Sequence, residues 1–168
     1  MTAWTLIFFA PPSFLNPARL AGFDVKLSDT GSQKPASPHR HLETLLELAR
    51  ESDILFVCCR GGEATHRLIN APVLAALGAD GFLVNLSRGR MVDESALLHA
   101  LRTGVIQGAG LDVYESEPKI DPVLFALPNT VLMPHLGSAT KETRAVMLRL
   151  TLDNLHAVLS GSAPLTPG

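Results

Sequence analysis

Three side chains that could together carry out acid–base chemistry on a small carboxylate follow three separate apolar runs. Arg88 comes after the run Phe82–Val84, while Glu117 and His135 lie in the segments GLDVYESEP and LMPHLGSAT. An arginine guanidinium can grip a carboxylate with two parallel hydrogen bonds and can polarise a carbonyl group. A carboxylate beside a histidine stabilises the imidazolium, which can exchange a proton with a substrate hydroxyl or carbonyl. This combination predicts an active site for a small acid.

Each of these residues also has an ordinary structural interpretation. Arg88 could be a surface arginine that pairs with an acid, His135 could be a core or surface histidine, and Glu117 precedes a proline in a common loop sequence. The catalytic interpretation is favoured because these residues and Asp112 would all follow the carboxyl ends of successive strands. Ligands of open α/β sheets bind at that edge, so we expect the four residues in one crevice.

The elements that must position these residues alternate along the chain from residue 4 to residue 159. Strands are expected at residues 4–10, 23–27, 53–59, 81–88, 105–113 and 130–133. Helices, given from cap to cap, are expected at residues 13–20, 39–50, 70–78, 93–104, 121–127 and 140–159. This order predicts an α/β fold with a doubly wound, mostly parallel sheet in a single domain over residues 1–160, followed by a tail at 161–168.

Composition narrows the classes of partner. The chain has 168 residues, of which 46% are hydrophobic and 18% charged, which suits a sheet buried on both faces. Its net charge is −2 and it has no basic cluster, so we expect no nucleic-acid partner. The apolar runs are too short for a membrane span and no secretory signal is recognisable, so we expect no membrane partner and a cytoplasmic protein. Cys58 and Cys59 are expected to be small buried hydrophobes, and no metal site is predicted.

Three longer segments carry a resemblance to a known family. NLSRGRMVDESALLHAL, GAGLDVYESEP and LPNTVLMPHLGSATKETR closely resemble the D-specific 2-hydroxyacid dehydrogenases, in particular the glyoxylate and hydroxypyruvate reductase branch. The resemblance implies a Rossmann-like fold and an NAD(P)-dependent oxidoreductase that reduces a small 2-keto acid to a D-2-hydroxy acid. On that match Arg88 would bind the substrate, Glu117 would orient and charge the histidine, and His135 would be the acid/base.

The resemblance also implies a set of residues that line NAD or NADP. Asp112 would hold the nicotinamide carboxamide, and Arg60 stands where relatives mostly carry proline. Asp29 ends the second expected strand, where an acid usually accepts hydrogen bonds from the adenosine ribose and disfavours a 2′-phosphate. NAD is therefore slightly favoured, although Asp29 could equally be a turn aspartate beside Thr30-Gly31. The other cofactor-lining positions are Cys59, Thr65, Leu86, Ser87, Arg88, His135, Gly137 and Ser138.

The beginning of the chain departs from the family pattern. Where the family has the turn G-x-G-x-x-G, whose backbone approaches a pyrophosphate, this chain reads Ala10-Pro11-Pro12-Ser13-Phe14. Proline has no amide donor, so we expect weak cofactor binding. We also expect residues 1–20 to be an atypical start and the family's substrate domain to be missing.

Two functions therefore stay open at this point. One is a reductase that keeps the chemical residues, and the other is a non-catalytic remnant domain that binds a small anion or a partner protein. In either case we expect a homodimer, because the segment 140–159 carries more apolar surface than a small sheet can cover.

Overall fold

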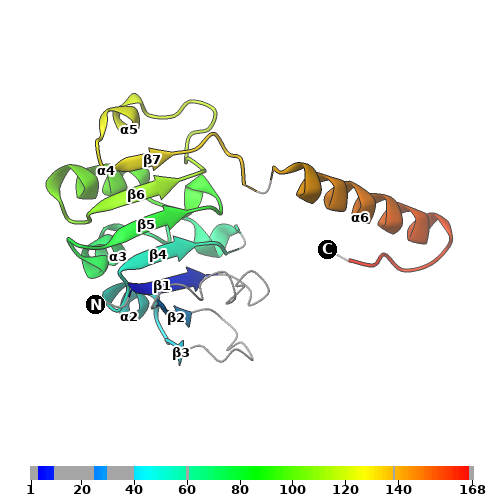
Figure 1. The fold of residues 1–168 in the computed structure, drawn as a ribbon, viewed down its shortest axis with the longest axis horizontal. Coiled ribbons are helices and arrows are strands. Elements are labelled where there is room, and N and C mark those ends of the chain that lie inside the picture. Colours follow the sequence, from blue (N-terminus) through cyan, green and yellow to red (C-terminus); the bar gives the residue numbers. More distant parts are fainter. Residues whose placement is uncertain (1–3, 10–24, 30–39, 60, 138, 167–168) are drawn as a thin grey trace. The chain divides into compact units, whose positions relative to one another are not determined.

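A seven-stranded sheet dominates the computed structural model, which describes residues 4–9, 25–29, 40–59, 61–137 and 139–166. The chain divides into two compact units, Met1–His135 and Leu136–Gly168. The sheet belongs to the first unit (Figure 1). Its strands are β1 (Trp4–Phe9), β2 (Val25–Asp29), β3 (Arg40–His41), β4 (Ile54–Val57), β5 (Phe82–Asn85), β6 (Gly108–Leu111) and β7 (Thr130–Leu132).

The strand order is β3-β2-β1-β4-β5-β6-β7, and every neighbouring pair is parallel. The chain adds strands on one side of β1 and then returns to add β4–β7 on the other side, so the direction of winding reverses beside β1. This confirms the predicted doubly wound fold. All the strands point the same way in Figure 1, so their carboxyl ends lie at one edge of the sheet.

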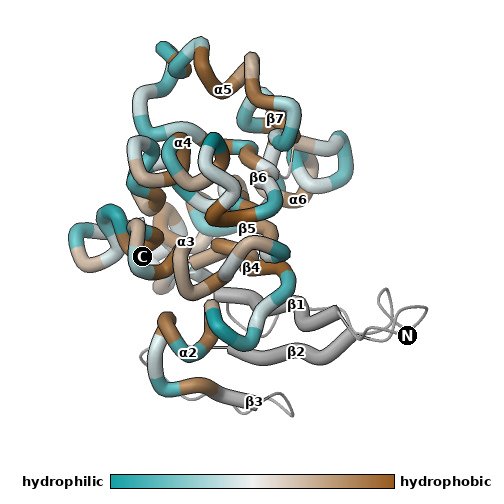
Figure 2. Tube along the Cα trace, turned by 90° about the vertical axis from the view of Figure 1, so that its left-hand side faces the viewer, coloured by the Kyte–Doolittle hydropathy of each residue, from teal (hydrophilic) through white to brown (hydrophobic). Residues whose placement is uncertain are grey.

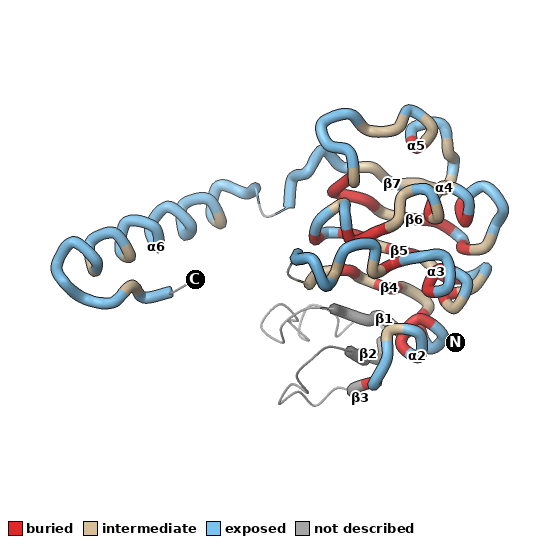
Figure 3. The backbone as a smooth tube through the Cα atoms, turned by 180° about the vertical axis from the view of Figure 1, so that it is seen from behind, coloured by how far each residue is buried: buried red, intermediate tan, exposed pale blue. Residues whose placement is uncertain are grey.

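Helices α2, α3 and α4 lie on the same face of the sheet (Figures 1 and 3). As the sequence predicts, Asn70 and Asp93 cap the amino ends of α3 and α4 with their side-chain oxygens, and Gly104 ends α4 in the left-handed conformation. The helices of this unit are α2 (Leu45–Arg50), α3 (Ala71–Leu77), α4 (Glu94–Thr103) and α5 (Pro122–Ala126), with short 3-10 turns η2 (Glu63–Thr65) and η3 (Gly89–Met91).

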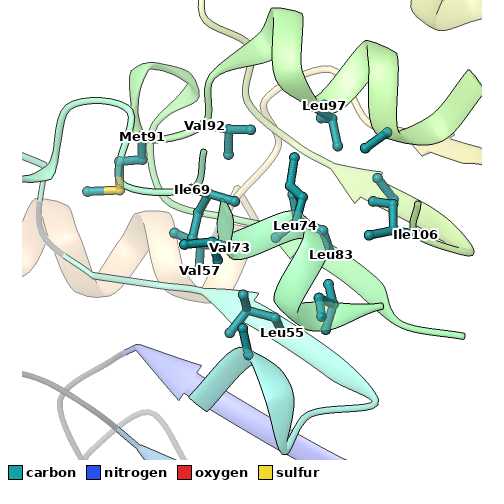
Figure 4. Close-up of a cluster of buried hydrophobic side chains, with 14 of the residues drawn as sticks. Leu55, Val57, Ile69, Val73, Leu74, Leu83, Met91, Val92, Leu97 and Ile106 are labelled. Carbon is teal, nitrogen blue, oxygen red and sulfur yellow. The ribbon is translucent and has the colours of Figure 1, made fainter. Parts of the chain in front are cut away.

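The core lies between these helices and the sheet. Residues of β4 and β5 alternate between half-buried and buried, as period-two side-chain geometry requires, and Leu55 and Leu83 point into the core. Leu74 of α3 and Leu97 of α4 belong to the same cluster of buried side chains (Figure 4). Figure 2 shows hydrophobic residues along the described central strands, and this packed layer holds the carboxyl edge in place.

One predicted element is partly wrong. The sequence pattern predicts one helix over residues 39–50, but Arg40 and His41 form β3, which pairs with β2, and α2 begins only at Leu45. Thr44 caps α2, with a reciprocal bond between Glu47 and the Thr44 amide. The sequence Thr44-x-x-Glu47 carries this start signal, which outweighs the helical spacing between Leu42 and the leucines that follow Thr44. The second strand begins two residues later than expected, at Val25, and it ends at Asp29, as predicted.

The second unit contains α6 (Lys141–Leu159), capped by Thr140 as the sequence predicts. No residue of α6 is buried. Thr166 in the following tail exchanges two hydrogen bonds with Asn154 of the helix. The expectation of one domain over residues 1–160 stays a prediction. Among the helices of the described ranges, none combines the length and apolar character that crossing a membrane requires.

Candidate active site

The structure places Arg88, Asp112, Glu117 and His135 beyond the carboxyl ends of adjacent parallel strands. Arg88 follows β5, Asp112 and Glu117 follow β6, and His135 follows β7. Because the three strands are parallel neighbours, the residues that follow them share one edge of the first unit.

The side chains of Glu117 and His135 are joined by a hydrogen bond. The Nδ1 atom of His135 lies 2.8 Å from Oε2 of Glu117, and the side chains are 47% and 32% exposed. Since a carboxylate only accepts, Nδ1 is the donor and Nε2 is the ring atom that can exchange a proton with a substrate. Oε1 of Glu117 accepts a second bond of 2.8 Å from the Tyr114 amide, so the carboxylate is held at both oxygens.

The backbone at His135 is unusual. Its φ angle is +52°, in the left-handed region that costs energy for a residue with a Cβ atom. The bond to Glu117 and the link between Tyr114 and Met133 hold this segment. Tertiary contacts, and not the local backbone preference of His135, thus set the orientation of its imidazole ring.

Tyr114 is a buried residue of this site that the sequence reasoning missed. Its hydroxyl donates to the Met133 carbonyl at 2.8 Å and also lies 3.2 Å from the Leu111 carbonyl. Burial is the main cause that raises the pKa of this phenol, so the hydroxyl stays a donor. Tyr114 thereby links the segment that carries Glu117 to the one that carries His135. The available signal was that the single tyrosine of the chain stands within GLDVYESEP.

Arg88 is exposed, and its backbone is held by Asn85. The buried Asn85 side chain donates to the Arg88 carbonyl at 3.1 Å and accepts from the Ser87 amide at 3.1 Å. Nη1 of Arg88 donates to the Ser87 carbonyl at 2.7 Å. In the part of the chain that the structure describes, no acidic side chain pairs with Arg88. The guanidinium can therefore donate hydrogen bonds to an external carboxylate.

Two of the predicted cofactor-lining side chains, those of Ser87 and Thr65, form hydrogen bonds within the protein. The Ser87 hydroxyl lies 2.5 Å from the Cys59 carbonyl and 3.0 Å from the Met91 sulfur, and the Thr65 hydroxyl lies 3.0 Å from the Gly62 carbonyl. These two hydroxyls therefore shape the loops after β5 and β4. Leu86 is 49% exposed and Asp112 is 3% exposed beyond the neighbouring strand ends.

The two cysteines are half-buried and carry free thiols. Burial raises the pKa of the Cys58 thiol, and it raises the pKa of Cys59 to about 11. The Cys59 sulfur lies 3.6 Å from the Met91 sulfur. Both thiols thus stay protonated near neutral pH, as expected for small hydrophobes.

Some predicted positions cannot be placed with these residues. Arg60, Ser138 and the segment 10–14 lie outside the described residues. Asp29 is the last residue of β2, as predicted, but its side chain also lies outside the description. Gly137 belongs to the second unit, where its φ angle is +48°.

Comparisons with known proteins point to one family. The family model of the D-isomer specific 2-hydroxyacid dehydrogenase, NAD binding domain, matches residues 16–137. A hydroxyphenylpyruvate reductase of Plectranthus scutellarioides is 46% identical over 150 residues, covering 89% of this chain and 48% of that protein. A glyoxylate/hydroxypyruvate reductase A of Arabidopsis thaliana is 46% identical over 134 residues, covering 80% of this chain and 43% of that protein.

A solved structure is similar over the whole chain. It is the NADPH-dependent glyoxylate/hydroxypyruvate reductase of Sinorhizobium meliloti in complex with NADP and malonate, with a TM-score of 0.92 and 37% identity. The match covers 100% of this chain and 54% of that one. The chain thus spans about half the length of the relatives it matches. With the family model matched over most of its residues, the chain belongs to the D-isomer specific 2-hydroxyacid dehydrogenases, as their NAD binding domain.

Proposed function

We propose that this chain supplies the cofactor-binding and acid–base parts of an NAD(P)-dependent reductase that converts a small 2-keto acid of the glyoxylate or hydroxypyruvate type into a D-2-hydroxy acid. The observation that carries the proposal is the 2.8 Å bond between His135 and Glu117 at the sheet edge that also bears Arg88. The relatives whose names include reduction of such acids support the substrate class.

The described residues fit a nicotinamide cofactor. The winding reversal beside β1 puts the usual dinucleotide site at the carboxyl edge, next to β4. Asp112 and Leu86 lie beyond the neighbouring strand ends, where they would hold and cover the nicotinamide. When bound, the cofactor supplies the hydride that reduces the keto carbon. Asp29 slightly favours NAD, whereas the Sinorhizobium meliloti relative is NADPH-dependent, so both cofactors need testing.

Residues of this chain would bind the substrate and transfer the proton. Arg88 would hold the substrate carboxylate and polarise the neighbouring carbonyl. His135 would donate the proton from Nε2 to the carbonyl oxygen as that oxygen becomes a hydroxyl. Glu117 would keep the proton on Nδ1, so that Nε2 is the ring nitrogen that faces the substrate. The same groups would run the reverse oxidation, with His135 accepting the proton.

The proposal is tested by titrating the chain with NADH and NADPH while following cofactor fluorescence, and then assaying cofactor oxidation with glyoxylate and hydroxypyruvate. We expect weak affinity, because Pro11 and Pro12 replace amide donors to the pyrophosphate. Losing two charge-assisted bonds costs roughly 3 to 6 kcal/mol, which moves a micromolar dissociation constant to about the millimolar range. A variant in which a glycine-rich turn replaces residues 10–14 should bind more tightly.

Turnover that disappears in His135→Asn would support the reductase. Binding of neither cofactor at millimolar concentration, together with no turnover, would contradict it and favour a non-catalytic domain. The homodimer and the cytoplasmic location stay proposals that rest on the sequence and on the exposed apolar side chains of α6.

A further inference from the structure

The loop that carries Glu117 rests against the segment that carries Arg88. A Cβ atom at Gly89 would lie 1.9 Å from both the carbonyl carbon and the oxygen of Tyr114 and 2.4 Å from the Glu115 amide nitrogen. The peptide between Tyr114 and Glu115 therefore packs directly on the Gly89 backbone. Only a residue without a side chain allows this approach.

The same peptide is bound at its amide by the first residue of α4. The Glu115 N–H donates to Oε2 of Glu94 at 3.0 Å. One residue earlier, the Tyr114 N–H donates to Oε1 of Glu117 at 2.8 Å. Two consecutive amides thus each bind a carboxylate, one from α4 and one from the pair with His135. A shift of this peptide would move Glu117 with it.

The side chain of Glu115 is held from another direction. Nε and Nη2 of Arg67, in the loop after β4, each lie 3.1 Å from its Oε1 atom. The Arg67 amide in turn donates to the Arg90 carbonyl at 2.8 Å. Arg67 is half-exposed, so this ion pair is screened by solvent. The partly buried bond from Glu115 to Glu94 is the more direct link between the two segments.

We propose that Glu94 is a positioning residue for the acid–base pair. By holding the Glu115 amide it sets the place of Glu117, and so the separation of the His135–Glu117 pair from Arg88, which lies six residues before Glu94 in the sequence. This role rests on the proposed reductase function. Glu94 acts through the backbone and does not itself need to touch the substrate.

The chemistry of the bond suggests which variants separate the possible roles. Glu94 could also stabilise α4 through its charge near the helix amino end. Glu94→Gln removes that charge but keeps an oxygen that can accept from the Glu115 amide. Glu94→Ala removes both. A positioning role therefore predicts that Gln restores what Ala loses, whereas a purely electrostatic role predicts equal losses.

The first measurement is amide hydrogen exchange by NMR on the full chain, without substrate. In Glu94→Ala we expect the Glu115 amide to exchange roughly 10 to 100 times faster, the range for losing a charge-assisted bond. Glu94→Gln should stay within a few-fold of the parent chain. Glu142→Ala is the matched control, since Glu142 is an exposed acid in the first turn of α6.

The second measurement is steady-state kinetics with glyoxylate. In Glu94→Ala we expect kcat to fall roughly tenfold with KM little changed, because the substrate carboxylate would still be held by Arg88. Glu94→Gln should retain most of the kcat of the parent chain. Unchanged Glu115 exchange in Glu94→Ala, or equal losses with Ala and Gln, would overturn the proposal. A parent chain that neither binds a cofactor nor turns over would overturn the proposed reaction alone, because amide exchange still decides whether Glu94 holds the loop.

Discussion

At the scale of single residues, the pair of His135 and Glu117 is the strongest chemical feature of the chain. Both carboxylate oxygens are occupied, one by the imidazole and one by the Tyr114 amide, so Glu117 can orient the ring without freedom to turn away. A carboxylate fixed in this way selects the histidine tautomer that presents Nε2 to a substrate.

Substitution of this pair should lower the chemical rate rather than stability. We expect His135→Asn to reduce kcat by about 10² to 10⁴, the range for loss of a general acid, and Glu117→Gln to have a smaller effect because the histidine remains. Steady-state assays with glyoxylate and hydroxypyruvate would measure this. Glu43→Gln, at an exposed position, is the control. Equal kcat in His135→Asn and the parent chain would refute the assigned role.

The half-buried cysteines should react slowly with alkylating reagents. In the parent chain, burial is the main cause that raises the pKa of the Cys59 thiol from an ordinary value of 9.0 to about 11. Cys58→Ser leaves Cys59 as the one thiol to follow. Since the thiolate is the reactive form, iodoacetamide at pH 8 should react roughly 100-fold more slowly with the folded chain than with the same chain in urea. Mass spectrometry over time would follow the reaction. Similar rates in both states would show that the thiol is not protected by burial.

At the scale of elements, the caps and close backbone contacts hold the loops of the site. Asp93 begins α4 immediately before Glu94, and its carboxylate accepts from the Ser95 hydroxyl at 2.6 Å and the Ala96 amide at 3.1 Å. These bonds lower the pKa of Asp93, and the bond from the Ser95 hydroxyl has the largest effect.

Removing this cap should destabilise the fold in a pH-dependent way. Asp93→Ala should lower the free energy of unfolding by about 1 kcal/mol at pH 7. Because the pKa of Asp93 is lower in the folded chain, its contribution is present above the ordinary value of 3.8 and is lost as pH falls below it. Urea unfolding at pH 7 and at pH 3 should therefore show a smaller difference between variant and parent at pH 3. A difference in unfolding free energy that does not shrink at pH 3 would contradict this assignment. Asp93→Asn is the control: it keeps a capping oxygen, so its stability at pH 7 should differ little from that of the parent chain.

The contact between Gly89 and Tyr114 makes a second prediction about elements. In Gly89→Ala the new methyl group would overlap the Tyr114 carbonyl, so we expect a loss of roughly 1 to 3 kcal/mol in unfolding free energy. Gly62→Ala is a matched control, because a Cβ atom there meets nothing within 4 Å. Chemical denaturation would compare the two. Equal stability of both variants would mean that the two backbones do not approach so closely.

At the scale of the whole molecule, α6 carries apolar side chains that the second unit does not bury. The apolar residues of α6 are spread around the helix and do not gather on one face, so more than one face exposes apolar side chains. The exposed apolar side chains include Val146, Met147, Leu150, Leu155 and Val158.

We expect these side chains to support a homodimer. Light scattering at micromolar concentration should give about twice the chain mass of 18.0 kDa. Leu150→Glu should shift the mass toward the monomer, whereas Thr151→Glu, at an exposed position one residue along α6, should have less effect. A monomer mass for the parent chain would argue against the dimer.

Much of this molecule could be predicted from local patterns in the sequence. The apolar runs at β4 to β7, the caps Asn70 and Asp93, and the terminating Gly104 identify elements because these signals depend on neighbouring residues. Strand and helix alternation then implies parallel strands whose carboxyl ends share an edge, which brings Arg88, Glu117 and His135 to one side of the sheet.

The tertiary structure alone decided which groups touch. Strand β3 could not be predicted from the sequence, because it forms only by pairing with β2 and its own two residues carry no strand signal. Similarly, the choice of Glu117 as the contact of His135 came from the family resemblance, while the bonds from Tyr114 to Met133 and from Glu115 to Glu94 had no sequence signal. Such contacts join residues about 20 positions apart, and their geometry depends on how the loops pack after the sheet has formed.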